Sequence, residues 1–156
     1  MDSERLLEFL GCELEELRIE SNPADTKEGG ALPAPMIDFN AFVHASDRTM
    51  FAVTLSLKSS ESASSSYPIV FSVRVVGFFK VVEPFPEGAI HGERVVNALT
   101  ILYGIVRGHL VTSAAWFGKT FLLPTVYFTD LVNEKVAAAN KQQIAGPDQP
   151  PVRAIA

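Results

Sequence analysis

Residues 99–107 read LTILYGIVR and form the centre of the most informative stretch of this 156-residue chain, which runs from Asn97 to Asp130. Apolar side chains recur here at helical spacing. One stripe comprises Val95, Leu99, Leu102, Val106 and Leu110, and a second, nearly opposite, comprises Ala98, Ile101, Ile105 and Thr112. A helix that is apolar on two sides must be covered on two sides. The sequence therefore predicts a long helix within 87–117 that packs on a sheet of its own subunit and contacts another subunit on its other side.

Two glycines leave an alternative open for this helix. Gly104 and Gly108 lower the helix propensity in the middle of this segment. In the alternative, the helix breaks there and lies deep in the core of a monomer.

An apolar linker, Phe121 to Val126, follows the helix and is interrupted by Pro124. A last helix is expected from about Thr129 to Gln143, where Gly146 and Pro147 lie beyond its end. The proline-rich residues 146–156 are expected to form a flexible tail. The chain is thus expected to be a single domain, residues 1–145, followed by this tail.

Three segments before the helix alternate between apolar and polar residues, as strands do: Met36–Ala45, Met50–Lys58 and Ile69–Val82. A weaker strand is expected around Cys12–Ser21, where a helix capped by Asp2 or Ser3 is the alternative. Short turns between consecutive strands indicate an antiparallel sheet. The predicted fold is therefore α+β: a four-stranded antiparallel sheet followed by a long helix, an apolar linker and a C-terminal helix.

The segment 69–82 is apolar on more than one face. One face is wholly apolar, and the other mixes Phe78 and three valines with polar residues, which makes it a candidate contact surface. Gly77 in the middle of this segment predicts a bulge or a close approach of another part of the chain.

Composition excludes several classes of protein. A net charge of −5 and a pI near 5.2 argue against a general nucleic-acid binder, which needs a basic surface. The single cysteine, Cys12, excludes an intrachain disulfide and fits a reducing compartment. The N-terminus has acids where a signal peptide has bases, and the apolar run Val95–Val106 is shorter than the roughly 20 residues that span a bilayer. We expect a soluble, cytoplasmic protein without direct membrane insertion.

No pattern indicates catalysis. The sequence has no phosphate-binding glycine loop, no paired cysteines or histidines at metal-ligand spacing and no Gly-x-Ser-x-Gly motif. The scattered His44, His91 and His109 are expected to be surface or interface residues. A small α+β enzyme is the alternative class of protein. Acid–base chemistry needs a histidine or a carboxylate on the inner face of the sheet, whereas the inner faces predicted for this chain carry only hydrocarbon side chains. We therefore predict no enzyme activity, no metal site and no cofactor.

Four short motifs, in this order over about residues 9–143, resemble the SecB family of bacterial export chaperones. They are LRIESNP at 17–23, VVGFF at 75–79, ILY at 101–103 with Arg107 after it, and LPTVYF at 123–128. The chain lacks the proline–aromatic pair and the glutamate usual around the helical arginine, and the asparagine usual in the linker. This pattern is typical of a divergent SecB-like protein.

The resemblance implies an ATP-independent holdase that assembles as a tetramer, a dimer of dimers with the long helices between the sheets. Such a protein keeps unfolded precursors competent for export and delivers them to the SecA motor. Some SecB-like proteins instead hold an antitoxin. A non-chaperone α+β domain that binds one protein or small ligand is a further alternative.

A holdase needs exposed apolar grooves, and eight residues are the candidates for client binding: Phe42, Phe78, Phe121, Leu122, Val126, Phe128, Leu131 and Val132. The alternative for each is burial in the monomer core. Five residues are candidates for the oligomer interface: Ala98, Ile101, Ile105, Arg107 and Thr112. Trp116 and Phe117 are expected in the core or the interface. By position, Glu16 and Glu20 match family acids that contact the motor; the alternative is a solvated edge that blocks aggregation.

Overall fold

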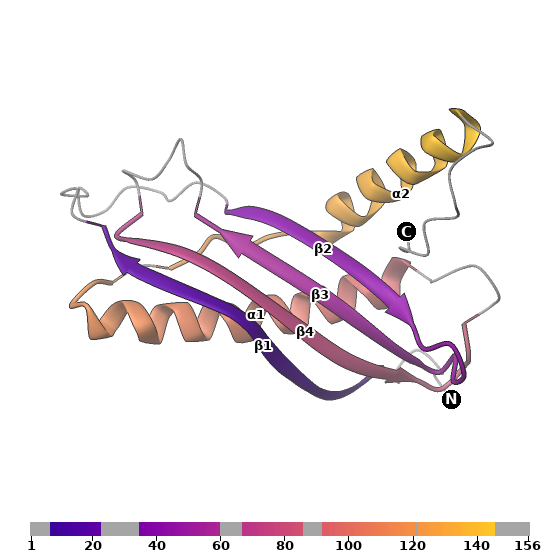
Figure 1. Cartoon of the computed structure of the whole chain (residues 1–156), viewed down its shortest axis with the longest axis horizontal. Helices are drawn as coiled ribbons and strands as arrows, with labels where there is room; N and C mark the ends of the chain where they lie inside the picture. The colour runs from indigo at the N-terminus through magenta and orange to yellow at the C-terminus, as the bar shows by residue number, and fades with distance from the viewer. Residues whose placement is uncertain (1–6, 23–34, 60–66, 86–91, 121, 146–156) are drawn as a thin grey trace.

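The computed structural model describes residues 7–22, 35–59, 67–85, 92–120 and 122–145, with only the backbone over 139–145. Six elements follow one another: β1 (Leu7–Ser21), β2 (Met36–Val43), β3 (Met50–Lys58), β4 (Ile69–Val81), α1 (Gly92–Trp116) and α2 (Phe128–Ala145) (Figure 1). The predicted α+β fold, a four-stranded sheet followed by a long helix and a C-terminal helix, is confirmed. The predictions for Phe121, His91 and the tail lie outside the described residues.

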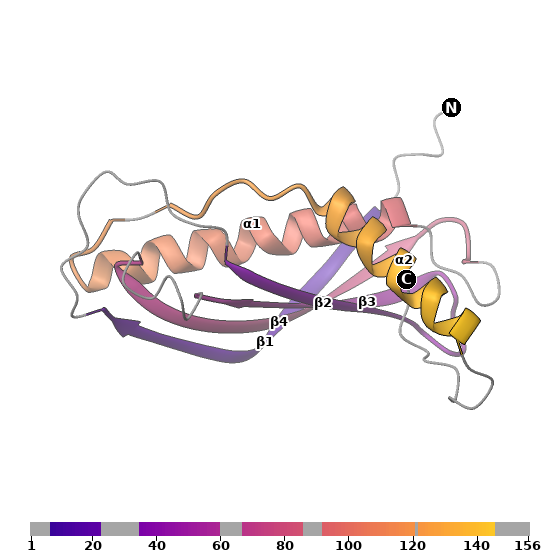
Figure 2. The same cartoon turned by 90° about the horizontal axis from the view of Figure 1, so that it is seen from above.

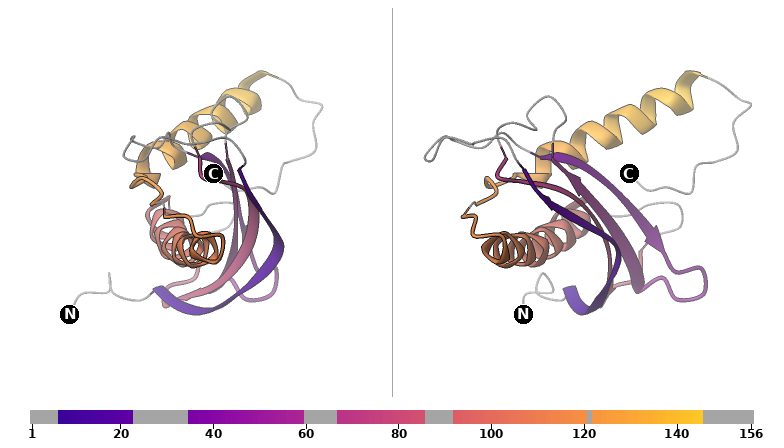
Figure 3. Two further views of the ribbon diagram at one scale, coloured as in Figure 1. Left: turned by 90° about the vertical axis from the view of Figure 1, so that its left-hand side faces the viewer. Right: turned by 60° about the vertical axis from the view of Figure 1, so that its left-hand side comes forward.

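All neighbouring strands are antiparallel, in the order β1-β4-β3-β2. Helix α1 lies along one face of this sheet, and no described element covers the opposite face (Figures 2 and 3). The inner residues of β3 and β4 alternate with outer ones and are almost completely buried under α1. The outer residues of the sheet therefore form a regular surface that none of the described elements covers.

Strand β1 keeps its apolar side chains on the helix side of the sheet through two shifts in its pairing with β4. The shifts lie between Phe9 and Gly11 and between Leu14 and Glu16. Each adds one residue, so positions 7, 9, 12, 14, 17 and 19 all lie opposite inner residues of β4. The strand therefore extends well before Cys12, and the alternative of a helix in this segment is wrong for the described residues.

Helix α1 is continuous over 25 residues, so the predicted long helix is present and the alternative of a break at Gly104 and Gly108 is wrong. Eight of its side chains are buried: Val95, Ala98, Leu99, Leu102, Tyr103, Val106, Leu110 and Ala114. The helix ends at Trp116, and the turn that follows contains Gly118, whose φ of 68° is the left-handed conformation that favours glycine. The amide of Lys119 then donates a hydrogen bond to the carbonyl of Ala114 at 2.9 Å.

The chain itself covers part of the second side of α1, contrary to the prediction that only another subunit is large enough to do so. The linker runs back along the helix (Figure 2), and the hydroxyl of Tyr103 donates a hydrogen bond to the carbonyl of Pro124 at 2.6 Å. Leu123 and Ala98 are completely buried. Ala98 therefore contacts its own subunit and leaves no surface for an oligomer interface.

Helix α2 begins against the core and then leaves the body of the subunit (Figures 1 and 3). Phe128 packs edge-to-face on Tyr103, with ring centroids 5.6 Å apart, and Val132 is also buried. Lys135 reaches β2, where its ammonium donates to the carbonyl of Phe39 and, at 3.1 Å, to Oδ1 of Asn40. These contacts hold the first half of α2 beside the edge of the sheet.

By length and composition alone, α1 could cross a membrane, since an 18-residue window within it has a mean hydropathy of 1.4. The uncharged apolar run ends at Val106, but Arg107 is the only Asp, Glu, Lys or Arg residue between it and Trp116. A core helix of a soluble protein meets the same criteria. Eight side chains of α1 are buried in the subunit, and 39% of the apolar window is buried.

Candidate functional site

The open face of the sheet carries a row of apolar side chains that crosses three strands. Phe42 on β2 lies opposite Ala52 on β3, and Ala52 lies opposite Phe78 on β4. Directly opposed residues of an antiparallel sheet share a face. Phe42 is 46% exposed and Phe78 is 36% exposed, whereas Ala52 between them is half-buried. We call Phe42, Ala52 and Phe78 the apolar row.

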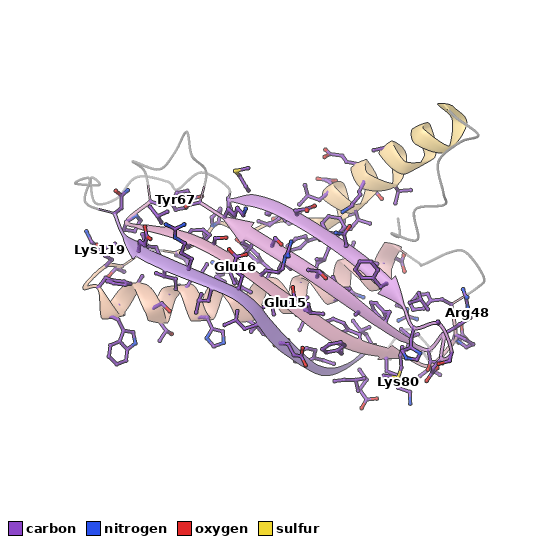
Figure 4. All side chains as sticks on the ribbon, viewed as in Figure 1. Glu15, Glu16, Arg48, Tyr67, Lys80 and Lys119 are labelled. Carbon is purple, nitrogen blue, oxygen red and sulfur yellow. The ribbon has the colours of Figure 1, made fainter. Side chains whose placement is uncertain are left out.

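Further along the strands from the apolar row, the same face of the sheet carries charged side chains. Glu16, Arg74, Ser56 and Asp38 lie side by side across the four strands. Here a shallow hollow of about 240 Å³ opens over the short side chains of Ser56 and Ser72. The Ser72 hydroxyl donates to Glu16 at 2.9 Å, and the Arg74 guanidinium donates to Ser56 at 3.3 Å. Figure 4 shows Glu15 and Glu16 at this part of the sheet.

The described residues predicted for client binding divide into three groups by their exposure. Phe42 and Phe78 are exposed in the apolar row, and Leu122 in the linker is 61% exposed. Val126 and Leu131 are half-buried against the core. Phe128 and Val132 are 2% and 3% exposed, so they belong to the core of the subunit, which was the alternative considered for them. Their burial follows from the direction of the linker, which turns this face of α2 towards Tyr103.

The uncovered side of α1 carries the remaining interface candidates. Ile101 and Ile105 are half-buried, and Thr112 is exposed, with its hydroxyl donating to the carbonyl of Gly108. Arg107 is half-buried, and its Nε has no hydrogen-bond partner among the described residues. Ile101, Ile105 and Thr112 thus keep part of their surface exposed in the subunit, and their place in an interface stays a prediction.

Trp116 and Phe117 lie at the end of α1 and are 86% and 45% exposed. The expectation that they lie in the core is therefore wrong, and their place in an interface stays a prediction.

The predicted motor-binding acids lie on the outer face of the edge strand β1. Glu20 forms an ion pair with Arg18 at 2.9 Å in which both side chains are mostly exposed. Exposed ion pairs of this kind contribute little to stability. Glu16 and Glu20 are thus accessible to a partner.

Sequence reasoning missed the apolar residues that β1 exposes on the helix side of the sheet. Phe9, Leu14 and Leu17 are 39%, 58% and 50% exposed, because α1 does not extend over the full width of this edge strand. The two shifts in register hid their alternation. Ala52 was also missed, since nothing in its own segment marks it as the centre of a row.

The titratable groups of the described residues include His44 and Asp47 in the turn after β2. No three histidine, cysteine or acidic side chains of this part of the chain converge to hold a metal ion. Nδ1 of His44 accepts hydrogen bonds from the amides of Ser46 and Asp47, at 3.3 and 3.1 Å, and so closes the turn after β2. Hydrogen bonds from Thr49 to the carboxylate of Asp47 lower its pKa, which stabilises the same turn.

Two buried tyrosines have raised pKa values. Burial raises the pKa of Tyr67 to about 12. It also raises the pKa of Tyr103, an effect that the nearby Arg107 guanidinium opposes. The hydroxyl of Tyr103 donates to the carbonyl of Pro124, so this phenol holds the linker against α1.

Comparisons with known proteins identify the fold. No protein-family model matches the sequence, and no curated protein matches it. Among solved structures, the chain is similar to the Mycobacterium tuberculosis Rv1957 SecB-like chaperone in complex with a ChAD peptide from the Rv1956 HigA1 antitoxin. The TM-score is 0.56 at 12% identity, over 79% of this chain and 92% of that chain.

A second similar structure is a protein of unknown function from Streptococcus agalactiae. Its TM-score is 0.57 at 9% identity, over 77% of this chain and 97% of that chain. Identities this low establish the fold alone. The chain therefore has a SecB-like fold.

Proposed function

We propose that this protein is an ATP-independent holdase, a chaperone that binds unfolded polypeptides and prevents their aggregation. The observation that carries the proposal is the apolar row, which exposes two phenylalanines on the open face of the sheet. A soluble protein gains nothing in stability from exposed aromatic rings, whereas a protein that binds apolar segments needs them. The likeness to the SecB-like chaperone Rv1957 supports the same class of function.

The affinity of a holdase comes from apolar burial spread over several sites. Each Å² of apolar surface removed from water contributes about 25 cal/mol, whatever the sequence of the client. Leu122, Val126 and Leu131 form a second apolar surface, at the linker and the start of α2, and Phe121 stays a candidate there. A long unfolded chain that engages both surfaces gains affinity because the second contact is intramolecular. Phe128 and Val132 are left out because they are buried.

Self-association would bring several copies of these two client-binding surfaces together in one assembly. We propose a dimer of dimers in which Ile101, Ile105, Arg107 and Thr112 of α1 face another subunit. The partial burial of Ile101 and Ile105 supports this arrangement, since a neighbouring subunit can cover the apolar surface that they still expose.

We propose more specifically that the protein acts in export. Its clients are then precursors that it keeps competent for translocation in the cytoplasm. The acids Glu16 and Glu20 contact a basic surface of the SecA motor. The Glu16→Gln, Glu20→Gln double variant should then bind SecA more weakly and hold unfolded clients as well as the parent.

A holdase dedicated to one client, such as an antitoxin, is the second candidate. It is favoured by the Rv1957 structure, which contains an antitoxin peptide. A dedicated protein binds one client far more tightly than unrelated unfolded chains, whereas a general one binds them similarly.

Suppression of aggregation tests the proposal. Lysozyme diluted from denaturant under reducing conditions aggregates, and light scattering follows the process. The protein, without any nucleotide, should suppress scattering at a few subunits per lysozyme chain. Scattering equal to that with the same mass of serum albumin would contradict a holdase.

A further inference from the structure

The turn that ends α1 exposes two aromatic rings at one end of the molecule. Trp116 is 86% exposed, more than any other large apolar residue of the described chain, and Phe117 beside it is 45% exposed. Lys119 follows, and Figure 4 shows it at the end of the longest axis, where α1 stops. We call residues 116–119 the tip. Large aromatic rings are mostly covered in folded proteins, so the exposed pair indicates a contact surface.

The tip is positively charged, although the chain as a whole is acidic. The sequence from Arg94 to Thr129 contains neither aspartate nor glutamate. Within the described part of the chain, Lys119 forms no ion pair. Strand β1 ends at the same end of the molecule as α1 (Figures 1 and 2), and Glu20 near that end is paired with Arg18. The ammonium of Lys119 therefore stands beside the two rings without a neutralising acid.

The backbone amides of the tip are hydrogen-bonded within the turn. The amide of Phe117 donates to the carbonyl of Ala114 at 3.0 Å, and the amide of Gly118 donates to the carbonyl of Ala115 at 3.0 Å. The amide of Lys119 also donates to Ala114. A donor that enters apolar surroundings costs free energy when it lacks an acceptor. These three amides keep their acceptors, so the turn can approach a region of low polarity without that cost.

We propose that the tip is a membrane-contact site, which rests on the surface of a bilayer that contains anionic lipids. Aromatic side chains favour the zone between headgroups and acyl chains, where the indole N–H still reaches a polar acceptor. A lysine beside them is attracted by the negative surface potential of such a bilayer. The contact is peripheral, because eight side chains of α1 stay buried in the subunit. This inference goes beyond the proposed holdase function and does not depend on it.

Charge decides against a second copy of this chain as the occupant of the tip. A symmetric contact between two tips would bring two Lys119 ammonium groups together, and like charges repel. An anionic bilayer has the opposite charge. Its surface is flat, so a tip at the end of the molecule reaches it without a matching cavity.

The fluorescence of Trp116 provides the first test, because it is the only tryptophan of the chain. The probe is vesicles made of equal parts phosphatidylcholine and phosphatidylglycerol. Their addition should shift the emission to shorter wavelength, and lipids brominated in the acyl chains should quench it. Emission that is neither shifted nor quenched would overturn the proposal. A shift caused by raising the protein concentration without vesicles would overturn it as well, since a second copy would then cover the tip.

Flotation with the same vesicles tests the other two side chains. Phe117→Ser should weaken binding about tenfold, the effect of losing the burial of one large apolar side chain. Lys119→Gln should weaken it about fivefold at low salt and have no effect on vesicles of phosphatidylcholine alone. Tyr127→Ser is the control, since it removes an exposed ring from the linker beside α2.

The control variant should bind within about twofold of the parent, and thermal unfolding verifies that each variant retains its fold. Equal effects of Phe117→Ser and Tyr127→Ser would show that any exposed ring of the protein adheres to lipid, and would overturn the tip as a site. Equal effects of Lys119→Gln on both kinds of vesicle would overturn the role of its charge.

Discussion

Leu102 of α1 lies so close to Gly77 of β4 that a Cβ atom at position 77 would be 2.6 Å from Cδ2 of Leu102. The pairing of Gly77 with Cys12 and with Val53 is regular on both sides of β4. Of the two expectations for this glycine, the close approach is therefore confirmed and the bulge is wrong. The absence of a side chain at Gly77 sets how deeply α1 packs on the sheet.

Gly77→Ala should destabilise the subunit by about 1–3 kcal/mol, because the added methyl group forces Leu102 and Phe79 out of their positions. Denaturant unfolding measures the change. Gly104→Ala is the matched control, since a Cβ there meets no atom within 4 Å and alanine raises helix propensity by about 1 kcal/mol. A parent-like stability of Gly77→Ala would contradict the packing described.

Lys135 fixes α2 to the edge of the sheet. Its ammonium donates to the carbonyl of Phe39 and lies 4.4 Å from the centroid of the Phe39 ring. Lys135→Met should free the helix, because both the hydrogen bond and the cation–π contact are lost. Hydrogen exchange should accelerate in residues 128–138 and remain unchanged in β3 and β4. The exposed neighbour Glu134→Gln should leave the exchange of α2 as it is; equal effects of both changes would count against the contact.

The raised pKa of Tyr67 makes stability depend on pH under alkaline conditions. The unfolded chain loses the phenol proton near pH 10, whereas the folded protein retains it to about pH 12. The unfolded state then binds fewer protons, so the free energy of unfolding falls as pH rises between these values. One proton corresponds to at most about 1.4 kcal/mol per pH unit. Tyr67→Phe should show a smaller decrease from pH 9 to pH 11, and an identical decrease would refute the assignment.

Ile105 tests the proposed assembly. Ile105→Asp places a charge on the uncovered side of α1, where the proposal buries apolar surface against another subunit, and a buried unpaired charge is costly. Light scattering coupled to size exclusion should show a tetramer for the parent and smaller species for the variant. Ser56→Asp, on the opposite face of the sheet, should remain tetrameric. A parent protein that is monomeric would show that the proposed interface does not form.

The fold was predictable where one face of each element is buried continuously. Strands β3 and β4 alternate strictly, and the stripe from Val95 to Leu110 is buried in full. The sequence pattern predicted β1 only weakly, because each of the two shifts in register reverses the alternation of apolar and polar residues along the strand. Such shifts become visible only when the partner strand is known.

The site was predictable only in part, because periodicity identifies an apolar face without naming what covers it. Phe78 was recognised as outward-facing from its place in β4, and it is exposed. Phe128 and Val132 lie in an equally apolar segment, yet the path of the linker along α1 buries them. Ala52 acquires its role from Phe42 and Phe78, which lie on two other strands, so the row exists only in the folded sheet.

The most direct test of the central claim is equilibrium binding of the protein to one polypeptide in two states. Labelled lysozyme is presented once in its native, disulfide-bonded form and once reduced and carbamidomethylated, so that sequence and net charge are nearly the same. A holdase should bind the unfolded form tightly, with several subunits per client, and leave the native form unbound. Equal binding of both forms, or binding of neither, would contradict the account.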